Sequence, residues 1–404
     1  MSARRPPGWW ARYITIHIIL LSWKTAAAGI PVGAGHLVVH IGPHKTGTTS
    51  FQSFLANNAD WIGLAPQLGG HLAVPRSMKH AKSIATFAHT LETIITPWKK
   101  STKAQYIDHK LYENIRADTE RGLAAGKTVI LSAEYLDGAS VELLKAISSV
   151  VKARKTTFVI VHRELIDWMR SLWAQQNKRS TSPTSLQKFL QTPLSISKKA
   201  ERMLSIGGTT TVIGASYEYL HEHEGLTAFI LCNVSQSPSP PDDHAWHRCK
   251  DAVYDREKAQ EHGSVQNVSP SAAIIETVRL AAHAATSLGR HPTLTADRDA
   301  TRVGLVFDQL PQKCIALSTD KLHAAAVADA RSFFEITRAH PPAGWPKKTT
   351  CIINETALEK KHWGILANLS GTEPPKQKKK GKKRRGVTQS PQWIEFVFVK
   401  SKSI

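Results

Sequence analysis

Four short apolar runs, joined by segments with helical spacing, constrain the fold of this 404-residue chain more than any other feature. Near-continuous apolar strands are typical of a sheet that is buried on both faces, and helices between the strands indicate that they run parallel. The sequence therefore predicts an α/β fold with a three-layer, doubly wound parallel sheet. The expected strands are residues 37–42, 128–134, 157–163 and 209–217.

Helices are expected between these strands and again in the C-terminal half of the chain. Phe51, Phe54 and Leu55 have the spacing of the first helix, and Gly126 suits the end of the second. We divide the region 36–365 into a core, 36–235, and a helical accessory part, 236–365. The expected helices are residues 50–62, 111–126, 141–153, 165–178, 272–288 and 321–338.

The first 28 residues have the order of a signal peptide. Arg4, Arg5 and Arg12 precede the apolar run 13–23, and the alanines at 26–28 suit a cleavage site. The apolar run is well short of the roughly 20 residues that span a bilayer. We therefore expect a signal peptide over residues 1–28, with an N-terminal membrane anchor or a buried first helix or strand as the alternatives.

Two further features favour the secretory pathway, either the Golgi lumen or secretion. Asn-x-Ser/Thr triplets are candidate glycan acceptors in a chain that enters the endoplasmic reticulum. Four cysteines permit two disulfides with three connectivities, and the absence of a CxxC spacing argues against a zinc site. The triplets begin at Asn233, Asn267, Asn354 and Asn368, and the cysteines are Cys232, Cys249, Cys314 and Cys351.

The net charge of +21 indicates an anionic partner. Residues 376–385 carry eight positive charges, which leaves 21 − 8 = +13 for the rest of the chain. In a chain that enters the lumen this tract is not a nuclear or nucleic-acid signal, so we expect a solvated tract or one that attracts an anionic glycan. We describe residues 371–390 as a basic low-complexity linker and 391–404 as a C-terminal tail with a candidate strand.

The segment HIGPHKTGTTSFQSFL, residues 40–55, contains a candidate anion-binding loop. It joins the first expected strand to the first expected helix, where parallel sheets bind ligands and where helix amides point at an anion. It is not a Walker A loop, because that motif has a lysine directly after its second glycine. Here Thr48 follows Gly47, and Lys45 precedes that glycine. An ordinary Gly/Thr-rich loop is the alternative interpretation.

A second pair of residues can bind a phosphate group. Arg163 ends the third expected strand, and Ser171 follows two helical turns later. An arginine supplies a fixed charge and several donors in a geometry that suits phosphate. Either residue alone says little, but in this order after the loop they form a joint signal.

Together, the K-[ST]-G-T-T pattern and the Arg163–Ser171 pair resemble the sulfotransferases that use 3′-phosphoadenosine 5′-phosphosulfate (PAPS). The resemblance is closest to the Golgi-type and related microbial carbohydrate sulfotransferases, and Asp167 also matches the family pattern R-x-x-x-D. It covers about residues 37–235. The C-terminal RKG-x-x-G-x-W loop of the cytosolic members has no good match, and KKHWG at 360–364 fits it poorly.

The resemblance implies a P-loop-type sheet, PAPS as co-substrate, and a carbohydrate hydroxyl or amine as acceptor, which can be anionic. It implies that Lys45 lies against the bridging oxygen of the donor and that Arg163 and Ser171 hold the 3′-phosphate. The residues implied to hold the 5′-phosphate are Lys45, Thr46, Gly47, Thr48, Thr49 and Ser50.

Sulfuryl transfer needs a base for the acceptor and a positive charge at the leaving oxygen. Glu134 ends the second expected strand at the same edge, and partial burial there would raise the pKa of its carboxyl group to suit a base. Helix capping or a salt bridge is the alternative role for Glu134, and His44 is the alternative base. No metal is expected, because the transferred group carries one negative charge.

Two other functions compete with the sulfotransferase interpretation. One is a P-loop kinase of small molecules, and the other is a non-catalytic glycan- or nucleotide-binding protein on the same fold. The expected partners are a glycan or another hydroxyl-bearing acceptor, with membrane anchoring through the N-terminus as an option and no nucleic acid.

Overall fold

The structure is a computed structural model. Predictions for the signal peptide, His44, Lys45, Asn267, the basic linker and the C-terminal tail fall outside the residues it describes. The described residues are 35–43, 46–68, 70–77, 83–96, 107–192, 194–235, 243–261, 270–317, 319–339 and 348–370.

Five parallel strands form the central sheet in the order β2-β3-β1-β4-β5. The four predicted strands are confirmed, with shifts of one or two residues at their ends. The fifth, β2, is too short to produce an apolar pattern in the sequence. The strands are β1 His36–Ile41, β2 Leu72–Ala73, β3 Thr128–Ser132, β4 Lys155–His162 and β5 Thr210–Ser216.

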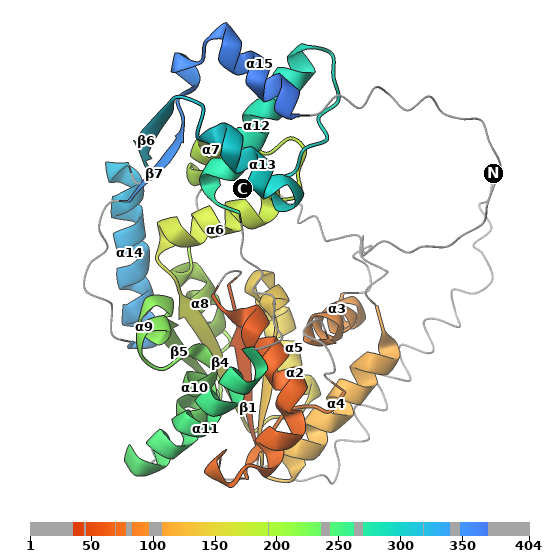
Figure 1. Cartoon of the computed structure of the whole chain (residues 1–404). Helices are drawn as coiled ribbons and strands as arrows, with labels where there is room; N and C mark the ends of the chain where they lie inside the picture. The colour runs from red at the N-terminus through yellow and green to blue at the C-terminus, as the bar shows by residue number, and fades with distance from the viewer. Residues whose placement is uncertain are drawn as a thin grey trace, which may run out of the picture.

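Helices flank the sheet (Figure 1), which confirms the prediction of an α/β fold with a helix-covered parallel sheet. Several start at the side chains that favour helix N-termini, such as Asp108 before α4 and Ser140 before α5. The helices of the core are α2 Thr48–Leu64, α3 Ser83–Ile95, α4 His109–Ala124, α5 Val141–Val150, α6 Leu165–Asn177, α7 Leu186–Leu190, α8 Ser197–Leu204, α9 Tyr217–His223 and α10 Leu226–Ala228, with 3-10 turns η1 Pro66–Leu68 and η3 Glu134–Gly138 and a π-helix η4 Phe229–Val234.

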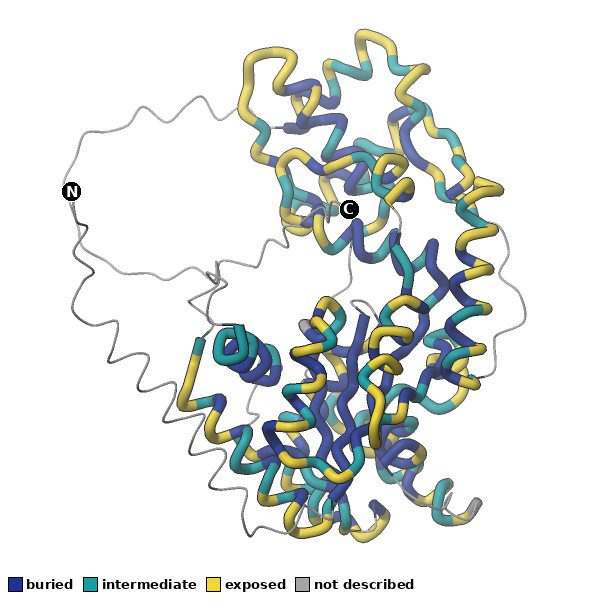
Figure 2. Tube along the Cα trace, turned by 180° about the vertical axis from the view of Figure 1, so that it is seen from behind, coloured by how far each residue is buried: buried dark blue, intermediate teal, exposed yellow. Residues whose placement is uncertain are grey.

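The core lies where the apolar strands meet these helices. Leu37, Val38, Val39 and Ile41 of β1 are fully buried, so both faces of this strand contact protein. Figure 2 shows the same pattern along the trace, with buried strands inside and exposed residues on the outer helix surfaces. Burial of each side chain of this size contributes about 1.5–3 kcal/mol to the stability of the fold. The sheet is therefore stable only when helices cover both of its faces.

The C-terminal helices pack onto the same core as the sheet. The predicted helices 272–288 and 321–338 are confirmed as α12 and α14. An antiparallel pair of strands, β6 and β7, was not predicted. The elements are α11 Asp243–Glu261, α12 Ala272–Ser287, α13 Ala296–Phe307, β6 Gln312–Ala316, α14 Asp320–Thr337, β7 Thr349–Ile353, η5 Glu355–Ala357 and α15 Lys360–Leu369.

Helix α14 packs the C-terminal part of the chain against the core. It runs along α8, α6 and β5, while α12, α13 and α15 pack together at one end (Figure 1). Gly214 of β5 permits this packing, because a Cβ there would lie 2.5 Å from Thr337 Oγ1 and 2.7 Å from the Phe333 ring. A larger residue at position 214 would therefore push α14 away from the sheet.

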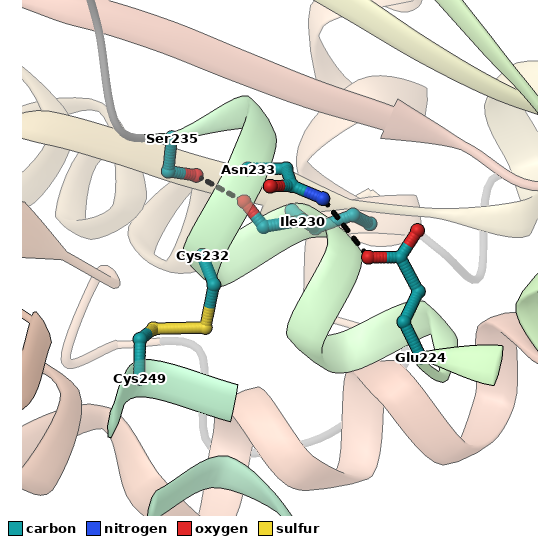
Figure 3. Close-up of a disulfide and its surroundings, with 6 residues drawn as sticks. All are labelled: Glu224, Ile230, Cys232, Asn233, Ser235 and Cys249. Atoms are coloured by element: carbon teal, nitrogen blue, oxygen red, sulfur yellow. Dashed lines mark hydrogen bonds between the residues drawn. A yellow bond between two sulfur atoms is a disulfide. The ribbon is translucent and has the colours of Figure 1, made fainter. Parts of the chain in front are cut away.

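Two disulfides resolve the three connectivities that the sequence left open. Cys232 of η4 bonds to Cys249 of α11 (Figure 3), and Cys314 of β6 bonds to Cys351 at the paired position of β7. Both bonds are compatible with an oxidising, secreted environment. Among the described residues, no helix combines the length and apolarity that a bilayer crossing requires.

Candidate functional site

The loop after β1 and the residue Arg163 leave the sheet at the same edge. Strands β1 and β4 are neighbours and parallel, and Ile41 pairs with Ile160. Gly42 and Arg163 therefore follow the carboxyl ends of adjacent strands, and neighbouring strands of a sheet lie about 5 Å apart. The start of the predicted loop and Arg163, separated by more than a hundred residues in sequence, thus lie at the same edge.

Two glycines shape the loop between β1 and α2. At Gly42 a Cβ would lie 1.7 Å from Thr48 Oγ1, so only glycine lets the strand end approach the helix start this closely. Gly47 has φ +83°, a left-handed conformation that glycine adopts without strain. These glycines fold the backbone back on itself, so the loop forms a tight turn directly before α2.

The hydroxyl groups of the loop divide into a buried and an exposed pair. Thr46 and Thr48 are buried, and Thr46 Oγ1 donates to Pro43 O at 2.7 Å, so these two threonines hold the turn together. Thr49 and Ser50 are exposed in the first turn of α2. A ligand that approaches from solvent would therefore contact Thr49 and Ser50 rather than the other two hydroxyls.

The N-terminus of α2 has no side-chain cap and no acidic residue in its first turn. In α6, by contrast, the carboxylate of Glu164 accepts from the amides of Ile166 and Asp167, each at 3.0 Å. First-turn amides without a capping side chain bind water or an anion. The first-turn amides of α2 can therefore bind an anionic ligand at the sheet edge.

Glu134 lies beside the loop, as its place after the second predicted strand suggests. It begins η3 after β3 and is half-buried, and Thr49 Oγ1 donates to its Oε1 at 2.9 Å. This hydrogen bond joins the first turn of α2 to the end of β3. A carboxylate at this position can accept a proton or orient the threonine hydroxyl.

His40 lies under the loop on β1 and is fully buried. Its Nδ1 is 2.9 Å from Ser132 Oγ, and its ring packs edge-on against Phe51 of α2. Burial lowers the pKa of His40 to about 3, although the negative charge of Glu134 opposes this effect. The imidazole is therefore neutral at physiological pH and supports the loop through its contacts with Ser132 and Phe51.

Arg163 packs against an aromatic ring that the sequence reasoning missed. Its guanidinium carbon lies 4.8 Å from the ring centroid of Tyr217, which follows β5 directly. Such a cation–π contact contributes about 0.5–1 kcal/mol at a partly exposed site and fixes the plane of the guanidinium group. An aromatic residue immediately after the strand next to Arg163 was the signal that could have revealed this contact.

Ser171 lies farther along α6 and is half-buried. It is six residues after Leu165, which corresponds to about 9 Å along the helix axis. Ser171 thus lies about two turns beyond Arg163, on the helix that this arginine precedes.

A lysine from the C-terminal part reaches the start of α6. Lys348, directly before β7, forms an ion pair with Asp167, and its Nζ lies 3.6 Å from Glu164. The sequence had instead singled out KKHWG, but these residues belong to α15, which packs against α12 and α13. Nothing in the sequence places Lys348 near Asp167, because the contact joins segments far apart in the chain.

A buried polar network anchors α14 next to Arg163. Asp329 of α14 accepts from the hydroxyls of Ser195 (2.5 Å) and Ser197 (2.7 Å), and it lies 3.3 Å from His162 Nε2. Burial alone would raise the pKa of Asp329, but these hydrogen bonds outweigh it and lower the pKa to about 2. His162 is the last residue of β4, so the network fixes the backbone that carries Arg163.

The chain matches no known family model, no curated protein and no solved structure. Within the part of the chain that the structure describes, no group of three or more His, Cys, Asp or Glu side chains is arranged to hold a metal ion. The function must therefore be argued from the geometry of the sheet edge.

Proposed function

We propose that the chain is a PAPS-dependent sulfotransferase that transfers a sulfuryl group to a hydroxyl or amine of a carbohydrate acceptor. Its fold would then be of the P-loop nucleotide-binding type. The observation that carries this proposal is the pairing of β1 with β4, which puts the loop at residues 42–50 and Arg163 at one sheet edge.

The residues at this edge fit a ligand with two separated phosphate groups. The turn made by Gly42 and Gly47 leaves no room for a side chain at residue 42, and α2 offers its amides without a side-chain cap. Thr49 and Ser50 add exposed hydroxyls, and Arg163 adds a fixed charge on the neighbouring strand. In this proposal the 5′-phosphate lies on the loop and the 3′-phosphate lies on Arg163 and Ser171.

PAPS supplies an activated sulfuryl group when it is bound. Lys45 is proposed to place its positive charge at the oxygen on which negative charge develops, a role that typically contributes several kcal/mol to catalysis. Glu134 is proposed to accept the proton of the acceptor hydroxyl, because its carboxylate lies at the start of α2 and bonds to Thr49. His44 remains the alternative base.

The acceptor is proposed to be a glycan encountered in the secretory pathway, in the Golgi lumen or outside the cell. Two disulfides and the Asn-x-Ser/Thr triplets at the exposed Asn233 and Asn368 support such a route. A signal peptide or anchor in residues 1–28 would direct the chain there. The positive net charge favours an acceptor that is itself anionic.

Calorimetry with 3′-phosphoadenosine 5′-phosphate, the desulfated donor, tests the nucleotide site directly. Loss of Arg163 should weaken binding by roughly 10- to 100-fold, because a charge-assisted contact to phosphate contributes about 1.5–3 kcal/mol. Lys45→Ala should weaken binding and abolish sulfate transfer from labelled PAPS. Lys110→Ala, an exposed lysine on α4, is the matched control.

The result that would overturn the proposal is tight binding of ATP–magnesium with no binding of the desulfated donor, since that pattern indicates a kinase. Equal affinity of wild type and Arg163→Ala would show that the two anion sites do not share one ligand. Tight binding of the desulfated donor without sulfate transfer to any glycan would support the non-catalytic alternative.

A further inference from the structure

A pocket of about 400 Å³ lies between the loop after α6, helix α7 and helix α12, apart from the sheet edge described above. One wall is the loop 182–185 with Lys188 of α7. The other is a face of α12 that carries Arg279, His283 and Thr286. These three residues are spaced four and three positions apart, so they line one side of the helix.

Buried polar groups hold the loop wall in place. Asn177 Oδ1 accepts from the amide of Thr184 at 2.8 Å, and the Trp173 indole donates to Thr184 O at 2.9 Å. Glu276, which is buried on α12, accepts from the amide of Leu186 at 2.6 Å. The loop therefore needs little reordering when a ligand binds, which lowers the entropic cost of binding.

Two cationic side chains, Lys188 and Arg279, line the pocket. Arg279 donates to Glu276 Oε2 at 2.5 Å and also pairs with Glu355, so two carboxylates offset its charge. Lys188 is exposed and lines the pocket outside these ion pairs. His283 is exposed, its ring lies 5.8 Å from the Trp363 ring, and it can offer a ring N–H as a donor.

The remaining surface of the pocket suits a sugar. Pro183 and Ala282 are buried and form an apolar base, while Ser182, Ser185 and Thr286 provide hydroxyl groups around it. An apolar base with a few surrounding polar groups is the usual composition of a small-ligand site. A pyranose ring has the matching chemistry, with an apolar face and hydroxyls at its perimeter.

From these features we infer that the pocket binds an acidic sugar residue of a polysaccharide. Lys188 and His283 face its carboxylate or sulfate group, and the hydroxyls of the loop 182–185 and Thr286 bind its ring hydroxyls. The statement that this polysaccharide is also the sulfate acceptor rests on the proposed sulfotransferase function.

The position of the pocket sets the length of such an acceptor. Helix α6 begins beside Arg163 and ends at Asn177, so the pocket lies at the opposite end of a helix about 20 Å long. A monosaccharide cannot contact both places. The pocket therefore selects polymeric acceptors of several sugar residues and leaves the nucleotide site unaffected.

Fluorescence anisotropy with labelled oligosaccharides tests the inference on the full chain. The probes are a hyaluronan octasaccharide, which carries carboxylates, a neutral maltooctaose, and a single-stranded DNA of equal charge. We expect the wild type to bind hyaluronan more tightly than maltooctaose. The double variant K188Q/H283Q should bind hyaluronan about 10-fold more weakly, because it loses the charge-assisted contact of Lys188 and replaces the ring donor of His283. The control K110Q should change the affinity by less than about twofold.

Equal hyaluronan affinity of the wild type and K188Q/H283Q would overturn the inference. A loss of DNA affinity as large as the loss for hyaluronan would also overturn it, because the pocket would then bind polyanions without regard to sugar. Melting curves of both variants show that each remains folded. Binding of the desulfated donor, measured in parallel, separates the two proposals. If the wild type does not bind this nucleotide, the sulfotransferase function is wrong. The hyaluronan comparison tests the pocket independently of that result.

Discussion

Replacing Glu134 with glutamine distinguishes a catalytic base from a residue that only orients the loop. Glutamine keeps an oxygen at the position of Oε1, so it still accepts from Thr49 Oγ1, which lies 2.9 Å away in the wild type. The change removes the negative charge and the ability to take a proton. The shape of the site stays the same.

The two roles predict effects of different size. A neutral acceptor in place of a charged one weakens a hydrogen bond by about 1 kcal/mol, which is roughly a fivefold effect on a rate or an affinity. A general base contributes about 10²- to 10⁴-fold. Because Glu134 is half-buried and partly solvated, the fivefold figure is an upper bound for the orienting role. We expect kcat of Glu134→Gln to fall by at least ~100-fold, with an affinity for the desulfated donor within ~5-fold of the wild type.

The assay is transfer of labelled sulfate from PAPS to the best acceptor of a glycan panel, with calorimetry for nucleotide binding. Thr49→Val is the matched control, because it removes the hydrogen bond and leaves the carboxylate in place. If Glu134 is the base, Thr49→Val loses much less activity than Glu134→Gln. Equal losses in the two variants, or a fall in kcat below about 10-fold for Glu134→Gln, would refute the assignment.

Three further predictions concern stability. Asp329→Asn should lower the free energy of unfolding by about 2–4 kcal/mol, because several buried donors lose a charged acceptor. Urea unfolding measures this change. The control Asp255→Asn, at an exposed position, should change the free energy of unfolding by less than about 0.5 kcal/mol. Gly42→Ala should lower the free energy of unfolding by about 1–3 kcal/mol and weaken binding of the desulfated donor, because the new Cβ overlaps the start of α2. An unchanged melting temperature and affinity would contradict the tight turn. The pKa of His40 is lowered from 6.5 to about 3, so its neutral form stabilises the fold fully above pH 6.5, and this contribution is lost as the pH falls below that value. Unfolding at pH 5 should therefore cost about 2 kcal/mol less than at pH 7 on account of His40, a difference that is absent in His40→Gln.

Much of the sheet could be predicted because its signal is local. The apolar runs at β1, β3, β4 and β5 are visible in a few consecutive residues, and Glu134 and Arg163 lie where parallel strands end. Because the carboxyl ends of parallel strands share one edge of the sheet, the sequence predicted that these two residues lie at the same edge, even though the order of the strands was unknown. The two-residue β2 was missed because a segment that short has no periodicity.

The details of the candidate site depend on contacts that no local pattern encodes. The cation–π contact of Arg163 with Tyr217 and the ion pair of Lys348 with Asp167 each join segments far apart in sequence. The division of the loop hydroxyls into a buried and an exposed pair depends on where α2 begins and on the turn before it, and no local pattern gives either. The disulfide pairing was open for the same reason.

The central place of β1 has a consequence for how the chain is made. This strand is synthesised first, yet its neighbours in the sheet are residues 128–132 and 155–162. An apolar segment therefore leaves the ribosome long before either partner exists, and sheets built from such distant pairings fold slowly and aggregate easily. Production of active material will depend on chaperones and on the rate of translation as much as on the final stability of the protein.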